Sequence, residues 1–407
     1  MKEMATSTMD RPNQVYSRAV SGLDNDTLAF LPFADSIRRT LRNHPRTNFT
    51  PDPMTLEDLV IDGPWSETAG ENPNNFLLYD SGPMANSRVV VFAADQCLGK
   101  FASAETWFMD GNFSMAPLLF QQLYMYVVRV PLGETANSVA YALLTNKTQQ
   151  TYEELLEALV DGCGERNWDG DPKTIILDFE IAAIQAIRSV IGNHVRIQCC
   201  FYHLTQSTWR KIQELGLSNL YRDSEEFRVH CGMLDALQLL PTQDVCRGMA
   251  YVQDNFPDEG EALIKYFDAT YVTGSFRRVQ QPNRPLILRR IAPRFPPSLW
   301  NVHDATVNND PRTKNQCEGW NNKFQHLVRH NHPSVWRLIN CLKDEHSFVS
   351  ALVLQDEIEN PPRKRTKRVY RDRQERLQNL CIAYDDGQKS LEDFLRCVAR
   401  NIRLGDV

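Results

Sequence analysis

Three acidic residues, Asp110, Asp178 and Glu318, stand in settings that each present a carboxylate at the edge of a sheet. Asp110 lies in the extended run 106–115, and Asp178 directly follows the short apolar run 174–177. Glu318 lies near the start of a later helical pattern. Converging carboxylates can hold two divalent metal ions, which stabilise both the attacking and the leaving oxygen when a phosphodiester is cut. Our first hypothesis is therefore metal-dependent phosphodiester chemistry with these three acids as catalytic residues and metal ligands.

The segments around these acids predict a mixed sheet. Residues 107–115, 122–130 and 138–144 are rich in β-forming side chains and predict three consecutive antiparallel strands. Residues 174–177 and 195–201 predict two further strands, each followed by apolar residues at helical spacing. Strands joined through helical crossovers lie parallel, so we expect an α/β fold: a mixed sheet with helices on both faces.

The helices next to these strands carry recognisable ends. Residues 151–160 have helical spacing, and Thr151 with Glu154 three residues later predicts a capping box. Glu180 falls in the first turn of the helix that follows Asp178. An acid at that position stabilises a helix without any catalysis, and we prefer that interpretation to a role in the site.

The chain divides into five predicted regions. Residues 1–95 form a region of mixed structure with no zinc finger, and residues 96–216 form the first part of the α/β core. Residues 217–305 form a mainly helical insertion that ends in a Pro- and Arg-rich piece for which no element is predicted. Residues 306–350 return to the core with its last helix, and residues 351–407 form a basic linker and a C-terminal helix.

Composition limits the class of protein. The 407 residues suffice for two or three domains, and 42% hydrophobic with 24% charged residues is ordinary for a globular chain. The N-terminus shows no apolar segment of signal-peptide length, and no stretch approaches the roughly 20 apolar residues of a membrane span. We expect an intracellular protein with no membrane contact, if this is the whole gene product.

The ten cysteines form no Cys-x-x-Cys pair, which predicts reduced thiols. Only Cys97 falls in the first hundred residues, so an ordinary four-ligand zinc finger is excluded there.

Charge is distributed unevenly along the chain. A net charge of −6 argues against nonselective coating of nucleic acid, but one segment without acids concentrates arginines that we take as candidate DNA-binding residues: Arg277, Arg278, Arg289, Arg290 and Arg294. A second basic run, 363–373, follows two prolines. Its interpretation stays open between a solvated linker and a second polyanion contact.

Cys200 and His203 have a spacing that could supply two zinc ligands. The other two ligands would have to come from distant pairs, either His330 and His332 or His230 and Cys231. Two ligands do not make a site, so we prefer a buried thiol and a polar cap at a strand-to-helix junction.

Four segments together carry a specific resemblance. They are Glu-Thr-Trp-Phe-Met-Asp-Gly-Asn-Phe (105–113), Leu-Asp-Phe-Glu (177–180), Cys-Phe-Tyr-His (200–203) and Arg-Thr-Lys-Asn-Gln-Cys-Glu-Gly-Trp (312–320). In order and spacing they resemble the central catalytic domain of the Mutator-like element (MULE) transposases, over roughly residues 90–345. The resemblance implies a ribonuclease-H-like fold with an Asp-Asp-Glu triad and a helical insertion before the last catalytic helix.

The resemblance also implies roles. Asp110 would contact both metal ions, Asp178 one and Glu318 the other, with Mg²⁺ or Mn²⁺ as the ion and no small-molecule cofactor. Water or a 3′-hydroxyl would attack phosphorus in line. The partners would be transposon ends and target DNA, bound by a homo-oligomer in the nucleus.

One departure from the family pattern leaves an alternative open. The family usually carries an N-terminal zinc-binding DNA-recognition module, which the early residues here do not form. The alternative is a domesticated transposase-derived protein that binds DNA or chromatin without catalysis.

Overall fold

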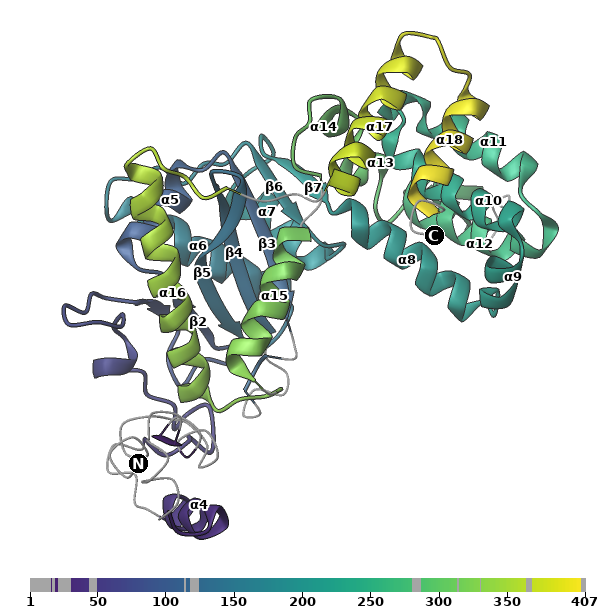
Figure 1. Ribbon diagram of the computed structural model, residues 1–407. Helices are drawn as coiled ribbons and strands as arrows, with labels where there is room; N and C mark the ends of the chain where they lie inside the picture. Colours follow the sequence, from purple (N-terminus) through teal and green to yellow (C-terminus); the bar gives the residue numbers. More distant parts are fainter. Residues whose placement is uncertain are drawn as a thin grey trace.

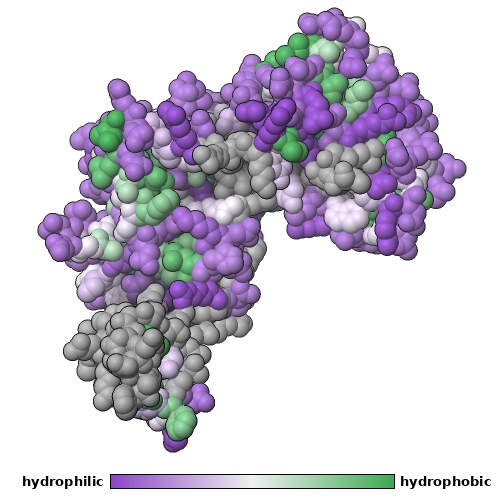
Figure 2. Space-filling view, in the orientation of Figure 1, coloured by the Kyte–Doolittle hydropathy of each residue, from purple (hydrophilic) through white to green (hydrophobic). Residues whose placement is uncertain are grey.

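The computed structural model forms two lobes, one built on a sheet and the other helical (Figure 1). It describes residues 16, 19–20, 31–43, 50–112, 115–117, 124–279, 287–312, 315–329, 331–363 and 368–403. The same view drawn with atoms as spheres shows a largely hydrophilic surface, hollowed between the two lobes (Figure 2). None of the described helices combines the length and apolar character needed to cross a membrane.

The sheet has seven strands in the order β1-β2-β5-β4-β3-β6-β7. Their bounds are β1 Leu77–Asp80, β2 Val89–Phe92, β3 Thr106–Asn112, β4 Tyr124–Leu132, β5 Thr135–Leu144, β6 Thr174–Leu177 and β7 Arg196–Cys199. Strands β3, β4 and β5 are antiparallel neighbours, whereas β6 pairs parallel with β3 and β7 parallel with β6. The predicted mixed α/β sheet is confirmed, and its strand order is compatible with a ribonuclease-H-like fold. Antiparallel β2 and β1 extend it beyond β5, so the sheet includes residues from the region 1–95.

Helices cover both faces of the sheet, as predicted. One face packs on α5 (Asp95–Ser103), α6 (Gln149–Gly164) and α7 (Ile181–Val190), and the other on α15 (Asn315–Val328) and α16 (Val335–Glu357). Successive residues of a strand point to opposite faces. Val128 accordingly joins the first core and Val127 the second, and both are buried.

The predicted cap of α6 is wrong by three residues, nearly one helical turn. The N-cap is Thr148, whose side chain accepts a hydrogen bond from the backbone N–H of Thr151. The Thr151 side chain is buried against the sheet, where its hydroxyl lies 3.0 Å from that of Ser87. Gly192 and Gly216 end α7 and α8 (Phe201–Glu214) with φ of +115° and +72°, values that favour glycine.

The helical lobe joins the insertion to the C-terminal part of the chain. It contains α8, α9 (Ser218–Asp223), α10 (Glu225–Ala236), α11 (Val245–Asn255), α12 (Glu261–Phe267), α13 (Pro297–Trp300), α14 (His303–Val307), α17 (Arg368–Asp385) and α18 (Leu391–Arg403). Helix α18 packs so closely on α10 that a Cβ at Gly232 would lie 2.9 Å from the Cβ of Ala399. Arg403 of α18 also pairs with the fully buried Asp235 of α10 at 2.5 Å. The end of the chain therefore completes the core of the insertion with two helices, where the sequence predicted one.

A two-stranded hairpin, β8 (Ser275–Val279) and β9 (Ile287–Ile291), occupies the Arg-rich piece for which no element was predicted. Arginines hold positions where a strand pattern normally shows apolar residues, so periodicity gave no signal there. The nine cysteines whose side chains the structure describes are free thiols.

The segment between α16 and α17 is held where it crosses the sheet lobe. The backbone N–H of Glu134, in the turn between β4 and β5, donates to the carbonyl of Pro362 at 3.2 Å. Gly133 precedes it with a φ of +55°, and a Cβ there would lie 2.6 Å from the same carbonyl oxygen. The turn thus accepts the linker only because residue 133 is glycine.

We predict that Gly133→Ala destabilises the protein by about 1–3 kcal/mol more than Gly387→Ala, because only the first adds a steric overlap to the backbone strain. Gly387 is the matched control, since it has a φ of +70° with nothing within 4 Å of its Cβ position. Urea unfolding of both variants measures the difference, and faster proteolysis between α16 and α17 should accompany it. Equal losses in the two variants would contradict the proposed contact.

Candidate active site

Asp110 lies on β3, and Asp178 directly follows β6, the parallel strand next to β3. Residues 106–108 of β3 pair in register with residues 174–176 of β6, and continuing this register by two residues puts Asp110 beside Asp178. Adjacent strands are about 4.8 Å apart. The two carboxylates, 68 positions apart in the sequence (178 − 110), therefore stand at one edge of the sheet.

Asp110 is buried, with 7% of its surface exposed, and it contacts two polar groups from other elements. The Asn321 side-chain amide of α15 donates to Asp110 Oδ2 at 2.8 Å, and Arg129 Nη1 of β4 lies 3.7 Å from the same oxygen. Arg129 is fully buried, with its Nε donating to Ser138 Oγ at 3.1 Å and its guanidinium 4.3 Å from the ring centre of Trp320. The buried guanidinium of Arg129 thus lies within ion-pair distance of the Asp110 carboxylate.

Asp178 is partly exposed and forms an ion pair with His203 of α8, with Nδ1 and Oδ1 2.9 Å apart. Burial by itself lowers the pKa of His203, but interactions with Asp178 and Cys200 outweigh it and raise the pKa to about 9. The imidazole is therefore protonated at neutral pH. Each of the two carboxylates thus faces a cation supplied by a different element.

Position 318 lies in the first turn of α15, and its side chain is outside the described part of the structure. The chain that enters this helix is tied to the end of β7, because the N–H of Phe201 donates to the carbonyl of Arg312 at 3.2 Å. One turn after position 318, Asn321 contacts Asp110. The backbone of Glu318 therefore stands at the same edge of the sheet as the two aspartates.

Glu180 and Lys147 border this edge. Tyr152 donates its hydroxyl to Glu180 Oε1 at 2.8 Å, and Lys147 Nζ lies 3.8 Å from the same oxygen. Burial lowers the pKa of Lys147, and the charges of Glu180 and Asp178 partly offset that effect. Glu180 is the N-cap residue of α7 and does not lie in its first turn, where the sequence placed it; its side chain makes no capping hydrogen bond and contacts Tyr152 of α6 instead.

Cys200 is a buried N-cap residue of α8, the junction position preferred from the sequence. The distant histidines and cysteine considered as zinc ligands have other surroundings. His230 Nδ1 contacts the carbonyl of Glu226 at 2.8 Å, and His332 Nδ1 contacts the carbonyl of Ala116 at 3.0 Å. Cys231 is buried in α10, and His330 lies outside the described residues. Within the described ranges, no group of three or more His, Cys, Asp or Glu side chains is arranged to hold a metal.

The donor set nevertheless suits a hard divalent cation. Asp110 and Asp178 supply charged carboxylate oxygens on adjacent strands, and the Asp178 side chain is 31% exposed, so water and ions can reach it. The side chain of Glu318, the third ligand expected from the sequence, lies outside the described part of the structure. The two aspartates are thus chemically suited to Mg²⁺ or Mn²⁺.

The candidate DNA-binding arginines lie on the β8–β9 hairpin and just after it, on elements other than those that carry the carboxylates. Arg277 and Arg278 are exposed on β8, and Arg289 and Arg290 are exposed on β9. Arg294 follows the hairpin, with its guanidinium 5.5 Å from the ring centre of Phe295.

Sequence reasoning missed Arg129, Asn321 and the pairing of His203 with Asp178. A charged residue inside the apolar strand run 127–132 was the available signal for Arg129. The three-residue offset from Glu318 was the signal for Asn321, because residues three apart share a helix face. Nothing local indicates the partner of His203.

We predict that replacing Asp178 with Asn lowers the pKa of His203 from about 9 towards its ordinary value of 6.5, because burial remains while the carboxylate charge is lost. Since the folded pKa is the raised one, the stability that the ion pair contributes is complete below pH 6.5 and disappears as pH rises through 9. An NMR titration of the imidazole in EDTA measures the pKa. The Asp171→Asn variant is the control and should leave His203 unchanged; a wild-type value near 6.5 would contradict the ion pair.

Comparison with known proteins gives one finding. A search of curated proteins found no match for the chain. Residues 106–207 match the model of the MULE transposase domain, a segment that runs from β3 into α8 and includes Asp110, Asp178 and His203 but ends before α15. The chain thus carries a MULE transposase domain, which supports assigning it to the MULE transposase family, with a transposase-type function and DNA as its implied partner.

Proposed function

We propose that the protein is a DNA transposase that cuts and joins DNA strands with Asp110, Asp178 and Glu318 as its catalytic, metal-binding carboxylates. The observation that carries the proposal is the juxtaposition of Asp110 and Asp178 on adjacent strands inside the matched MULE domain. The tie between α15 and both β3 and β7 supports Glu318 as the third member. The proposed compartment is the nucleus, where chromosomal DNA would be the substrate.

The surrounding residues would prepare the carboxylates for this task. Arg129 forms an ion pair with Asp110 from within the core, and Asn321 fixes one of its oxygens by donating a hydrogen bond. His203 compensates the charge of Asp178 from the opposite side. Since the two aspartates stand side by side, these partners reduce their mutual repulsion and keep both side chains in place.

Bound Mg²⁺ or Mn²⁺ would supply Lewis acidity at the phosphodiester and lower the pKa of the attacking water or 3′-hydroxyl. Asp110, the more deeply buried of the two aspartates, would orient the metal site because its side chain is held in one conformation. The partly exposed Asp178 lies where solvent and the DNA backbone can approach it. Lys147, beside Glu180, adds a cation at the same edge.

We predict that Asp110→Asn, Asp178→Asn and Glu318→Gln each reduce DNA cleavage by at least about a hundredfold, because each removes one charged ligand of the site. The assay uses the full chain, DNA carrying candidate terminal repeats and either Mg²⁺ or Mn²⁺, with products resolved on a denaturing gel. Circular dichroism should show that all three variants keep the fold.

Asp171→Asn is the matched control, since this exposed carboxylate pairs with His194 before the start of β6, at the far edge of the sheet. It should cut like the wild type. Cleavage that survives in Asp178→Asn would refute the assignment. Binding of DNA without cleavage by the wild type would instead support the domesticated, noncatalytic alternative.

A further inference from the structure

The β8–β9 hairpin exposes arginines on both of its faces. Its register places Arg277 opposite Arg289 on one face, and Phe276 opposite Arg290 and Arg278 opposite Leu288 on the other. On the second face Phe276 is 69% exposed and Leu288 60%, and on the first face Ile291 is 44% exposed and Arg277 and Arg289 are exposed, so neither face is buried against the rest of the described chain. No acidic residue occurs from Thr273 to Arg294.

This arrangement is unfavourable for the hairpin by itself. Like charges directly opposite one another in a sheet destabilise it, and Arg277 and Arg289 are such a pair. A two-stranded hairpin with no buried face is marginal in water. Charge repulsion and exposed apolar side chains are both relieved when such an element binds a polyanion.

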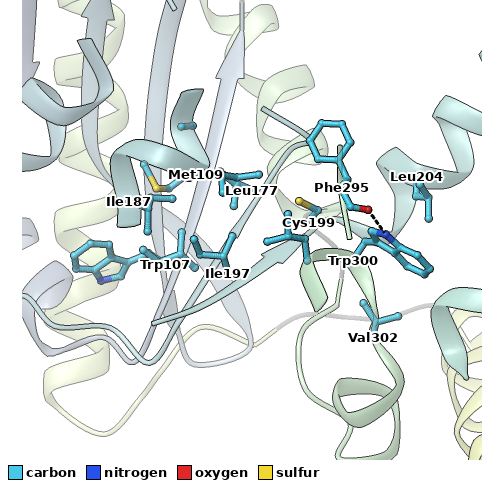
Figure 3. Packing of buried hydrophobic residues seen from close by; sticks show 14 of the residues in the cluster. Trp107, Met109, Leu177, Ile187, Ile197, Cys199, Leu204, Phe295, Trp300 and Val302 are labelled. Atoms are coloured by element: carbon cyan, nitrogen blue, oxygen red, sulfur yellow. Dashed lines mark hydrogen bonds between the residues drawn. The ribbon is translucent and has the colours of Figure 1, made fainter. Parts of the chain in front are cut away.

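The base of the hairpin is fixed beside the candidate active site. Phe179 directly follows Asp178, and its ring packs edge-on against Tyr271 and Phe295, at centroid distances of 5.7 and 5.0 Å. These two aromatic residues flank the hairpin on either side in the sequence. Phe295 also lies near Leu177 and Cys199 and accepts a hydrogen bond at its carbonyl from Trp300 Nε1 at 2.9 Å (Figure 3).

The hairpin also starts from a rigid turn. Gly274 has a φ of +83°, and a Cβ there would overlap the carbonyl of Ile291. The π-helical turn Asp268–Val272 precedes it, and the Phe295 N–H donates to the carbonyl of Thr270 at 3.0 Å. The exposed arginines are therefore carried on a hairpin whose base packs on Phe179, the residue next to Asp178.

We propose that the β8–β9 hairpin is a duplex-DNA-binding ribbon that lies in a groove of the DNA flanking the bond to be cut. A flat phosphate surface could reach the arginines of one face only, whereas a groove offers phosphates on both walls. The major groove of B-DNA is wide enough for a two-stranded ribbon. This inference rests on the proposed function for its DNA substrate, and it adds the element that holds that substrate.

The test measures binding without cutting. The full chain is titrated in EDTA against a fluorescein-labelled duplex and the matching single strand, over a series of salt concentrations, by fluorescence anisotropy. The variants are Arg277→Ala/Arg289→Ala for one face and Arg278→Ala/Arg290→Ala for the other. The control is Arg188→Ala/Arg196→Ala, which changes the net charge equally with exposed arginines of α7 and β7.

Each hairpin variant should weaken duplex binding on the order of tenfold and reduce the slope of log K against log salt by about 1.8, the value for two phosphate contacts. The melting temperature of Arg277→Ala/Arg289→Ala should stay constant or rise, because the variant removes an opposed pair of like charges. The control should bind like the wild type.

Three results would overturn the proposal. Wild-type binding by both variants would show that the hairpin does not bind DNA. Weaker binding by only one of the two variants would exclude binding in a groove. Weaker binding of the single strand alone would exclude duplex DNA as the ligand. EDTA prevents cutting, so this assay measures binding alone. If the hairpin variants bind more weakly but the wild type never cleaves DNA with Mg²⁺ or Mn²⁺, the proposed chemistry is refuted and the proposed DNA-binding role of the hairpin stands.

Discussion

The compensation of two neighbouring negative charges is the constraint on which the site depends. Asp110 and Asp178 occupy adjacent strands of one sheet, where unscreened carboxylates would repel each other. Arg129 forms an ion pair with Asp110 from inside the core, and His203 forms one with Asp178 from the start of α8. The cost of burying Arg129 is reduced by Ser138 and by the ring of Trp320, although neither Nη atom has a hydrogen-bond partner within the described part of the structure.

The sheet and its two helical layers serve to hold these groups in register. Helix α15 has two functions, because it covers one face of the sheet and brings Asn321 to Asp110. Its start is tied to the end of β7 through Arg312, although the whole insertion lies between them in the sequence. The helical lobe therefore leaves the sheet and returns to it at the edge that carries the acids. The C-terminal helices then close the core of that lobe through Asp235 and Arg403.

The acidic site at Asp110 and Asp178 and the basic β8–β9 hairpin would complement each other in binding one kind of substrate, DNA. The carboxylates of Asp110 and Asp178 attract cations, and the exposed arginines of the β8–β9 hairpin attract anions. A DNA phosphodiester with bound divalent ions would satisfy both at once. Phe179 joins the two features, since it follows Asp178 and packs on both residues that flank the hairpin. A chain with an overall charge of −6 can hold DNA in this way only if its positive charge is concentrated locally.

The sequence by itself determined the strands β3 to β7, the mixed character of the sheet, the glycine ends of α7 and α8 and the positions of the acids. These depend on local periodicity, on residue preferences and on four short motifs. Only the tertiary structure decided that Arg129 and His203 pair with the aspartates, that β1 and β2 join the sheet, that Thr148 caps α6 and that the C-terminal helices complete the insertion. It also decided that an Arg-rich piece is a hairpin. The physical reason is that each of these outcomes depends on groups that meet in space from separate parts of the chain. Asp110 and Arg129 are 19 positions apart (129 − 110), Asp178 and His203 are 25 apart (203 − 178), and Asp235 and Arg403 are 168 apart (403 − 235). Thr151 is buried against Ser87, 64 positions earlier, and Thr148 is the cap instead. A local pattern carries no information about such partners.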